Sequence, residues 1–284
     1  MNILVTGSNG QLGSELRNLE KEYSNHKFFF TDLNELDITN AERTMHYVKS
    51  NKIEVAINCA AFTAVDSAET QKSEVTLINA TGAKNIAQAC SKFNALLIHI
   101  STDYVFEGKN FKPYTENDTA GPKTTYGKSK LDGEIEVIFN AKRAIILRTS
   151  WLFSSHGNNF VKTIYEKAKK EKEIKVVYDQ IGNPTYAGDL ARAILEIIPK
   201  VPQKIRTEIY NFSNEGIASW YDFAHAIVNI KKLSCKVTPV LSKEFPTEAI
   251  RPYYSVLNKS RVKKDFGITL PHWRDSLGVC LAKM

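Results

Sequence analysis

The sequence predicts an α/β fold, a doubly wound, Rossmann-like parallel sheet followed by a smaller carboxyl-terminal lobe. Short, β-branched apolar runs alternate with longer helical patterns through the first two thirds of the chain. These runs are apolar throughout, as in parallel strands buried on both faces. After about Trp151 the regularity loosens, and prolines separate shorter elements. We therefore expect a sheet domain over residues 1–150 and a lobe over residues 151–284, from which some elements return to the sheet.

Each of the first four expected strands is followed by a helical pattern. Strand patterns cover residues 3–5, 28–30, 55–57, 96–100 and 144–147. Helical patterns cover residues 10–22, 41–51, 74–93 and 126–139. The repeated change from a short apolar run to an amphipathic helical spacing indicates helices on both faces of one parallel sheet.

Composition and charge narrow the classes of protein that the chain can represent. Its 284 residues are 43% hydrophobic, enough for a full core. No stretch approaches the roughly 18 apolar residues of a membrane helix, and no basic leader opens the chain, so we expect a soluble, cytoplasmic protein. The net charge of +7 is spread out, and its densest run, residues 167–175, alternates Lys with Glu. That run favours a solvated helix over a nucleic-acid site, and a modest positive field would attract phosphates.

The cysteines and histidines give no support for a metal or redox site. Cys59, Cys90, Cys235 and Cys280 are widely scattered without a C-x-x-C pair, and the six histidines do not cluster. We expect reduced structural thiols and no metal ligands.

A glycine-rich segment lies where the first strand meets the first helix. Gly7, Gly10 and Gly13 allow the backbone to turn tightly and approach a pyrophosphate, whose charge the helix amino terminus attracts. The position predicts a dinucleotide site. Asp32 closes the second strand, 19 positions after Gly13, where an acid would accept hydrogen bonds from the adenosine ribose. The alternative is that Asp32 is a turn or cap residue.

Tyr126 and Lys130 are four residues apart, on one face of the last helix of the sheet domain. Hydride transfer to a carbonyl leaves an alkoxide, and a phenol can supply the proton it needs. An ammonium near 4 Å is worth roughly 4 kcal/mol, about three pKa units, so we expect Lys130 to lower the pKa of Tyr126. Such a pair also occurs by chance in helices. Thr102, however, ends the neighbouring strand at the sheet edge where such folds bind ligands.

With these residues the chain resembles the extended short-chain dehydrogenase/reductase family over nearly its whole length. The motifs that carry the resemblance are G-x-x-G-Q-L-G at 7–13, N-C-A-A-F-T-A-V-D at 58–66, S-T-D-Y-V-F at 101–106, Y-G-K-S-K at 126–130, R-T-S-W at 148–151, G-N-P-T at 182–185 and R-P at 251–252. Their order and number make the resemblance specific.

The resemblance implies a catalytic triad of Thr102, Tyr126 and Lys130, in which Tyr126 donates the proton and Lys130 also holds the nicotinamide ribose. The expected cofactor-binding residues are Gly7, Gly10, Gln11, Leu12, Gly13, Asp32, Asp37, Ile38, Ala60, Ala61, Phe62, Thr63, Tyr126 and Lys130. The expected substrate-binding residues are Thr102, Asp103 and Trp151, with Arg251 as a partner for a diphosphate.

The implied reaction is hydride transfer from NADP(H), or also NAD(H), to the C4 ketone of a dTDP-linked 4-keto-6-deoxy-L-hexose. Asp32 would repel the 2′-phosphate of NADP, so the cofactor preference stays open. We expect a monomer or a homodimer. Some family members dimerise through magnesium held by carboxylates, and Glu15 sits at a plausible position, but no further ligands match and we expect no obligatory metal.

Several of these residues have a structural interpretation as well. Trp151, Phe62 and Phe106 could be core residues. Arg148 could be an ion-pair partner, and Asp66 and Glu69 could cap the helix that follows Val65.

Two further functions remain open. A sugar-nucleotide epimerase of the same family would share the glycine loop and the Tyr/Lys pair. A non-catalytic regulatory subunit, similar to the β subunit of methionine adenosyltransferase, is the other, although Trp151 favours a sugar-nucleotide site.

Overall fold

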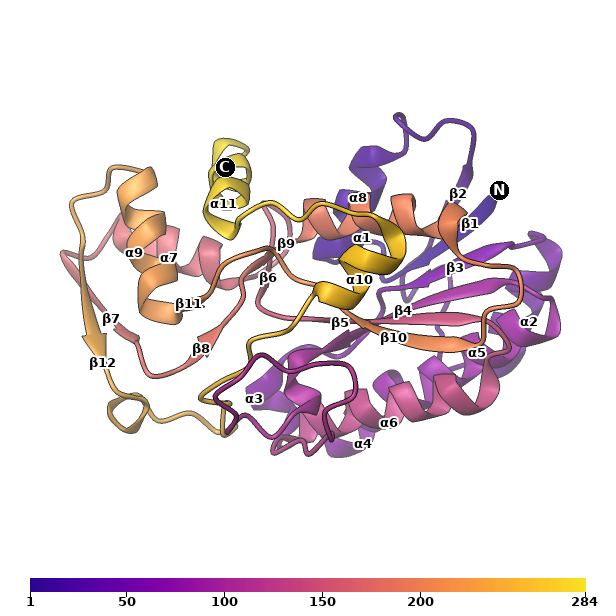
Figure 1. Ribbon diagram of the computed structural model, residues 1–284, viewed down its shortest axis with the longest axis horizontal. Helices are drawn as coiled ribbons and strands as arrows, with labels where there is room; N and C mark the ends of the chain where they lie inside the picture. Colours follow the sequence, from indigo (N-terminus) through magenta and orange to yellow (C-terminus); the bar gives the residue numbers. More distant parts are fainter.

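One six-stranded parallel sheet forms the centre of the computed structural model, which describes residues 1–284 (Figure 1). Its strands are β1 (Asn2–Thr6), β2 (Lys27–Phe30), β3 (Val55–Asn58), β4 (Leu96–Thr102), β5 (Ala144–Thr149) and β10 (Thr207–Asn211), in the order β10-β5-β4-β3-β1-β2. All five neighbouring pairs are parallel. The predicted doubly wound fold is confirmed.

Helices cover both faces of this sheet (Figure 1). One face carries α1 (Gln11–Leu19), α8 (Ala187–Ile197) and α10 (Ser260–Phe266), and the other carries α2 (Ala41–Ser50), α5 (Gly82–Lys92) and α6 (Thr125–Asn140). Alternate residues of a strand point to opposite faces. Ile3 and Val5 therefore pack with α1 and α8, whereas Leu4 packs with α2, α5 and α6. This two-sided burial explains the uninterrupted apolar runs.

The helix expected over residues 74–93 differs from the prediction. It consists of α4 (Lys72–Thr76), a π-helical turn η1 (Leu77–Thr81) and α5. π-turns insert an extra residue and are frequent at functional sites. Here the turn carries Asn79, whose buried amide bonds the backbone of Phe62 and the hydroxyl of Ser129. A requirement for polar contacts, which apolar spacing does not reveal, explains the irregular turn.

The lobe lies beside the sheet at the left of Figure 1 and has a core of its own, with Phe153, Phe223 and Trp273 at its centre. Its elements are β6 (Leu152–Phe153), α7 (Phe160–Ala168), β7 (Glu173–Val177), β8 (Ile181–Gly182), β9 (Thr185–Tyr186), β11 (Ala218–Ser219), α9 (Trp220–Ile230), β12 (Lys236–Val240) and α11 (Trp273–Ala282). Residues 151–284 thus supply this lobe, and also α8, β10 and α10 on the sheet.

The strand order reverses between β1 and β3, and in open α/β sheets the ligand crevice lies outside the carboxyl ends of the strands at such a point. Short helical segments lie near the strand ends and in the connections: α3 (Val65–Ala68), η2 (Asp103–Val105), η3 (Ile198–Lys200) and η4 (Ser242–Glu244). None of the helices has the length and apolar character that a membrane span requires.

Candidate active site

A crevice of about 800 Å³ opens at the carboxyl ends of β1, β3, β4 and β5, between the sheet and the lobe. The predicted residues that line it are Gly7, Gly10, Gln11, Leu12, Asp32, Asp37, Ile38, Ala60, Ala61, Thr63, Thr102, Asp103, Tyr126, Lys130, Trp151 and Arg251. Gly13 and Phe62 do not line it. The fold therefore brings together residues that are up to 244 positions apart in sequence, from Gly7 to Arg251 (251 − 7).

The glycine loop comes very close to its neighbours. Gly7 has a φ of +62°, and a Cβ there would lie 2.7 Å from Cα and N of Ala60, in the loop after β3. A Cβ on Gly13 would lie 2.5 Å from Cα of Ser8. This close approach explains why the chain has a glycine at a position that does not face the crevice. Gly10 precedes α1 without a side-chain cap, so the helix amino terminus stays free to attract an anion. The cradle fits a dinucleotide pyrophosphate.

Two acids border the outer end of the crevice. Both carboxylate oxygens of Asp32 accept backbone N–H groups, from Asn9 and from Leu33, each at 2.9 Å. Asp32 therefore ties the glycine loop to the end of β2, as the turn interpretation expected, while it also lines the crevice. Asp37 accepts two bonds from Thr39, at 2.9 Å from its N–H and 2.7 Å from its hydroxyl.

Phe62 lies in the loop after β3, and its backbone is fixed by Asn79. The Phe62 N–H donates to Oδ1 of Asn79 at 2.8 Å, and Nδ2 of Asn79 donates back to the Phe62 carbonyl at 3.1 Å. Since the crevice is lined by the flanking Ala61 and Thr63, the contribution of Phe62 is to the shape of the loop.

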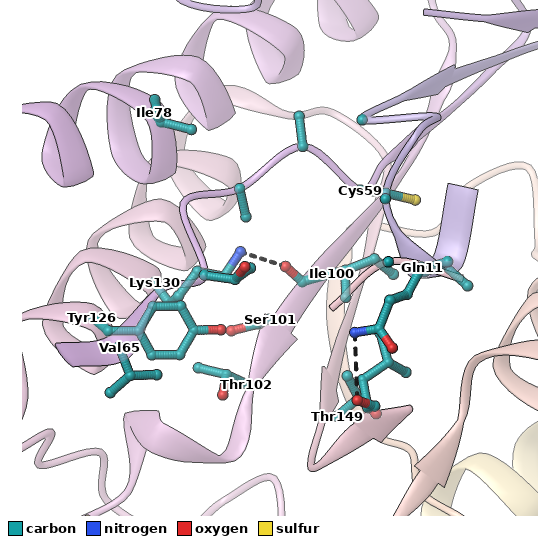
Figure 2. Close-up of a pocket in the computed structure, with 18 of the residues that line it drawn as sticks. Gln11, Cys59, Val65, Ile78, Ile100, Ser101, Thr102, Tyr126, Lys130 and Thr149 are labelled. Atoms are coloured by element: carbon teal, nitrogen blue, oxygen red, sulfur yellow. Dashed lines mark hydrogen bonds between the residues drawn. The ribbon is translucent and has the colours of Figure 1, made fainter. Parts of the chain in front are cut away.

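Tyr126 and Lys130 extend from the first turns of α6 toward the same part of the crevice (Figure 2). Glu69 helps to fix this end of the helix, because its carboxylate accepts the N–H and the hydroxyl of Thr125 at 2.9 and 2.7 Å. The Lys130 ammonium donates to the Ile100 carbonyl at 2.6 Å, a contact drawn as a dashed line between the two labelled residues in Figure 2.

The expectation that Lys130 lowers the pKa of Tyr126 is wrong. Burial raises the pKa of Tyr126 to about 12, against the opposing effect of a hydrogen bond with Thr102. Burial likewise lowers the pKa of Lys130 to about 8, partly offset by the Glu134 carboxylate. Burial removes water from the Tyr126 phenolate and from the Lys130 ammonium alike, and the spacing of the two residues in the sequence does not reveal this effect. The Lys130 ammonium also donates to a backbone carbonyl.

A buried ion pair lies behind Lys130. Glu134, one turn further along α6, binds Arg148 of β5 through two bonds of 2.9 and 2.7 Å, and the hydroxyl of Ser101 donates to the same carboxylate at 2.5 Å. Glu134 is 1% and Arg148 4% exposed. The structural interpretation of Arg148 as an ion-pair partner agrees with these contacts.

Thr102 and Asp103 end β4 beside Tyr126. The Thr102 hydroxyl donates to Oδ1 of Asp103 at 3.1 Å and accepts the N–H of Tyr104 at 3.2 Å. Oδ2 of Asp103 is buried and has no hydrogen bond of ordinary length and angle, and burial raises the pKa of this carboxyl to about 6 against the opposing effect of the Ser255 and Thr102 hydroxyls. A buried acceptor that lacks an ordinary hydrogen bond is costly unless a ligand supplies a donor.

Arg251 approaches the crevice from the loop after η4. Its guanidinium binds both carboxylate oxygens of Asp66, at 2.6 and 3.1 Å. A Trp151 indole stacks on Trp220 with the ring centroids 3.6 Å apart. These contacts bring the lobe and the sheet domain together around one crevice.

Several crevice residues were missed from sequence. They are Tyr104, whose ring meets that of Tyr126 edge-on at 5.7 Å, Thr149, whose buried hydroxyl has no partner, Trp220, and residues 157–160. Tyr104 and Thr149 lie within quoted motifs and could have been found there. Trp220 lies in a helical pattern with no local signal for a site.

Glu15, the residue considered for magnesium, is buried in α1. It accepts the Ser154 hydroxyl at 2.6 Å, and the Lys283 ammonium lies 3.9 Å away. No group of three or more His, Cys, Asp or Glu side chains in the structure is arranged to hold a metal ion.

The family model described as the RmlD substrate binding domain matches residues 1–284. The chain belongs to this family. A dTDP-4-dehydrorhamnose reductase of Aggregatibacter actinomycetemcomitans is 39% identical, over 97% of this chain and 96% of its own. The resemblance indicated by the motifs is thus confirmed at the level of the RmlD family.

Solved structures of RmlD-family relatives superpose closely on the chain. A dTDP-4-dehydrorhamnose reductase of Clostridium acetobutylicum has a TM-score of 0.95 and 42% identity, covering 100% of both chains. The dTDP-4-dehydrorhamnose reductase of Bacillus anthracis, in complex with NADP, has a TM-score of 0.94 and 37% identity, covering 100% of this chain and 99% of its own. The fold and the family are therefore those of these reductases.

Proposed function

We propose that the chain is an NAD(P)H-dependent oxidoreductase of dTDP-rhamnose biosynthesis, which reduces dTDP-4-dehydro-L-rhamnose to dTDP-L-rhamnose. The RmlD-family match along the whole chain and the reductases that resemble it support this reaction. The observation that carries it in the structure is the meeting of Tyr126, Lys130 and Thr102 at one point of the crevice, beside the glycine cradle.

The cofactor would lie along the carboxyl ends of β1 and β3. The amino terminus of α1 and the close approach of Gly7 to Ala60 suit its pyrophosphate, and Asp32 and Ile38 border the adenosine end. Ala61 and Thr63 would flank the cofactor further along, and Lys130 would hold the nicotinamide ribose. When bound, the nicotinamide supplies the hydride.

Tyr126 would supply the proton to the new alkoxide. Its raised pKa keeps the phenol protonated at neutral pH, which is the form that a proton donor needs in the direction of ketone reduction. Once the proton has left, burial opposes the phenolate, and the hydrogen bond with Thr102 favours it. Thr102 would hold the ketone oxygen beside the phenol.

The substrate would fill the part of the crevice between the sheet and the lobe. Oδ2 of Asp103 is suited to accept a hydrogen bond from a sugar hydroxyl, because it is buried and has no hydrogen bond of ordinary length and angle. Trp151 would border the sugar, and Arg251 the diphosphate. In this proposal residues 1–150 bind the dinucleotide and residues 151–284 mainly the dTDP-sugar. We place the enzyme in the cytoplasm, as a monomer or a homodimer.

The test is oxidation of NADPH and of NADH in the presence of dTDP-4-dehydro-L-rhamnose, with identification of the product. Net consumption of a reduced cofactor distinguishes a reductase from an epimerase, which returns its cofactor unchanged. Absence of turnover with both cofactors would disprove the substrate assignment. A change in the rate or affinity of methionine adenosyltransferase on addition of the chain would instead favour a regulatory subunit.

The Tyr126→Phe variant tests the proton donor. We expect turnover to fall by about two to four orders of magnitude, because a general acid contributes that much, while NADPH affinity changes little. Tyr178→Phe is the matched control, since Tyr178 is 47% exposed and outside the crevice. Wild-type turnover in Tyr126→Phe would show that another group donates the proton.

A further inference from the structure

Trp151 has one face of its indole covered by Trp220. The two ring centroids are 3.6 Å apart and the ring planes differ by 6°, so the rings overlap almost completely. Trp220 is the first residue of α9, and Phe160 packs against its ring at a centroid distance of 4.5 Å. This face of Trp151 is therefore not available to stack on a sugar.

The opposite face of the Trp151 indole is covered by Gly182. A Cβ on Gly182 would lie 2.6 Å from Cε2 of Trp151, 2.8 Å from Nε1 and 2.9 Å from Cζ2. Because Cε2 is nearest and its neighbours Nε1 and Cζ2 are slightly farther, Gly182 lies over the plane of the indole, on its N–H side. Trp220 occupies the other side, so the indole is enclosed between the two.

The two residues that enclose Trp151 are held together by the lobe itself. β8 and β11 pair antiparallel, with Ala218 opposite Gly182, and Trp220 follows two residues after Ala218. Ser219 and Asp222 form a capping box that fixes the start of α9. Gly182 and Trp220 are therefore placed by neighbouring segments of the lobe, and the Trp151 segment is joined to them through its carbonyl, which accepts the N–H of Thr185 at 3.2 Å.

Trp151 has an unusual backbone conformation. Its φ is +46°, a region that bulky side chains rarely adopt and that persists only where the surroundings enforce it. Strained residues of this kind cluster at ligand sites. The carbonyl of Trp151 accepts the N–H of Thr185 at 3.2 Å, and its ring packs between Gly182 and Trp220.

We infer that Trp220, together with Gly182, is a positioning residue that fixes Trp151 so that the edge of its indole, not a face, meets the sugar. Both faces are covered, and the edge carries the N–H, the one hydrogen-bond donor of the ring. The ligand chemistry is then a hydroxyl or carbonyl oxygen of the deoxyhexose. This inference rests on the proposed function for the identity of that ligand.

Trp220→Leu tests the enclosure, with Tyr221→Leu as the matched control on the same helix but outside the crevice. We expect the KM for the dTDP-sugar to rise roughly tenfold in Trp220→Leu, the effect of one ordinary hydrogen bond, with kcat nearly unchanged and NADPH affinity retained. Trp220→Phe keeps an aromatic face and should restore most of the loss. A KM within twofold of wild type in Trp220→Leu would overturn the inference.

Three further variants test whether the edge or a face of the indole binds the sugar, and one of them does not depend on the folding of Trp220→Leu. Trp151→Phe keeps a ring but lacks the N–H, so its KM should rise as much as in Trp151→Leu; a wild-type KM would show that stacking, not the edge, binds the sugar. Gly182→Ala displaces Trp151 while Trp220 stays intact, and should also raise KM. It remains informative if Trp220→Leu fails to fold.

Circular dichroism tests the stack without turnover. Rings in contact are energetically coupled, so thermal unfolding followed by this signal should show that Trp151→Leu/Trp220→Leu loses less stability than the sum of the two single variants. Trp151→Leu and Tyr221→Leu should be additive. Strict additivity of Trp151→Leu and Trp220→Leu would overturn the enclosure, whereas a protein that shows the coupling but reduces no 4-ketosugar would overturn the proposed function.

Discussion

The Asp66 carboxylate binds the Arg251 guanidinium at 2.6 and 3.1 Å, and this ion pair joins α3 to the loop after η4. Asp66 also accepts the N–H of Ala249 at 3.1 Å, so it holds the backbone of this loop as well as the Arg251 guanidinium. Both side chains keep solvent exposure, 43% for Asp66 and 22% for Arg251, and such pairs add little stability. The pair instead sets the charge at this part of the crevice, because Asp66 partly neutralises Arg251.

Arg251→Met should weaken binding of the dTDP-sugar. Loss of a charge-assisted contact of about 1.5–3 kcal/mol corresponds to a rise in KM of roughly 10- to 150-fold, with kcat much less affected. Steady-state kinetics measures this effect. Arg192→Met is the control, because Arg192 forms an exposed pair with Glu22 away from the crevice. Asp66→Asn should lower KM at low salt, since it removes a competing carboxylate; an unchanged KM in Arg251→Met would exclude the diphosphate contact.

The reduction rate should fall as the pH rises through about 8. Burial lowers the pKa of Lys130 from its usual 10.5 to about 8, so the ammonium is lost on the alkaline side of that value. This alkaline decrease is measured by kcat/KM as a function of pH. Lys128 is exposed on the same helix, so the control variant Lys128→Met should show the decrease at the same pH. In Glu134→Gln the alkaline decrease should move to lower pH, because the Glu134 carboxylate raises the pKa of Lys130 against the effect of burial. If the decrease occurs at the same pH in Glu134→Gln as in the wild type, it reports the titration of a group other than Lys130.

Asp103→Asn should stabilise the fold at neutral pH and weaken substrate binding. Burial raises the folded-state pKa of Asp103 from 3.8 to about 6, so the folded chain binds this proton more tightly than the unfolded chain does. The free energy of unfolding therefore falls as pH rises from about 4 to 6, by up to about 3 kcal/mol, and stays lower above that range.

Thermal unfolding at pH 7 and at pH 4 measures this effect. Asp103→Asn should raise Tm at pH 7 and have much less effect at pH 4, where Asp103 is protonated in the folded chain. Asp118→Asn is the opposite control, because hydrogen bonds from Thr115 lower the pKa of Asp118. An equal gain in Tm at both pH values would contradict a buried, titrating carboxylate.

Gly7→Ala should weaken NADPH binding far more than the strain of an alanine at positive φ would by itself. Gly7 and Gly267 have φ values of +62° and +59°, so an alanine costs about 1–2 kcal/mol at either position. A Cβ on Gly7 also meets the Ala60 backbone at 2.7 Å, whereas a Cβ on Gly267 has no neighbour within 4 Å. Titration with NADPH should therefore show weakened binding in Gly7→Ala and nearly normal binding in Gly267→Ala. Equal NADPH affinities of the two variants would show that the glycine loop can shift to accommodate the added Cβ.

The fold was largely predictable because each sheet element carries a local signal. The strands at residues 3–5, 55–57 and 96–100 are buried on both faces, and this burial produces apolar runs, interrupted only by His99. The π-turn at Leu77–Thr81 was not predictable, because its cause is the contact between Asn79 and Phe62, 17 residues away. Likewise β10 joins β5 at the sheet edge only after the chain has passed through much of the lobe.

The sequence by itself determined the sheet, the glycine loop and the spacing of Tyr126 from Lys130, since these depend on residues that are close together in the chain. Only the tertiary structure decided the direction in which burial moves both pKa values, the pairing of Arg251 with Asp66, and the enclosure of Trp151 between Gly182 and Trp220. The physical reason is that solvation, charge neighbours and ring contacts depend on which distant segments pack together, and no local pattern of residues carries that information.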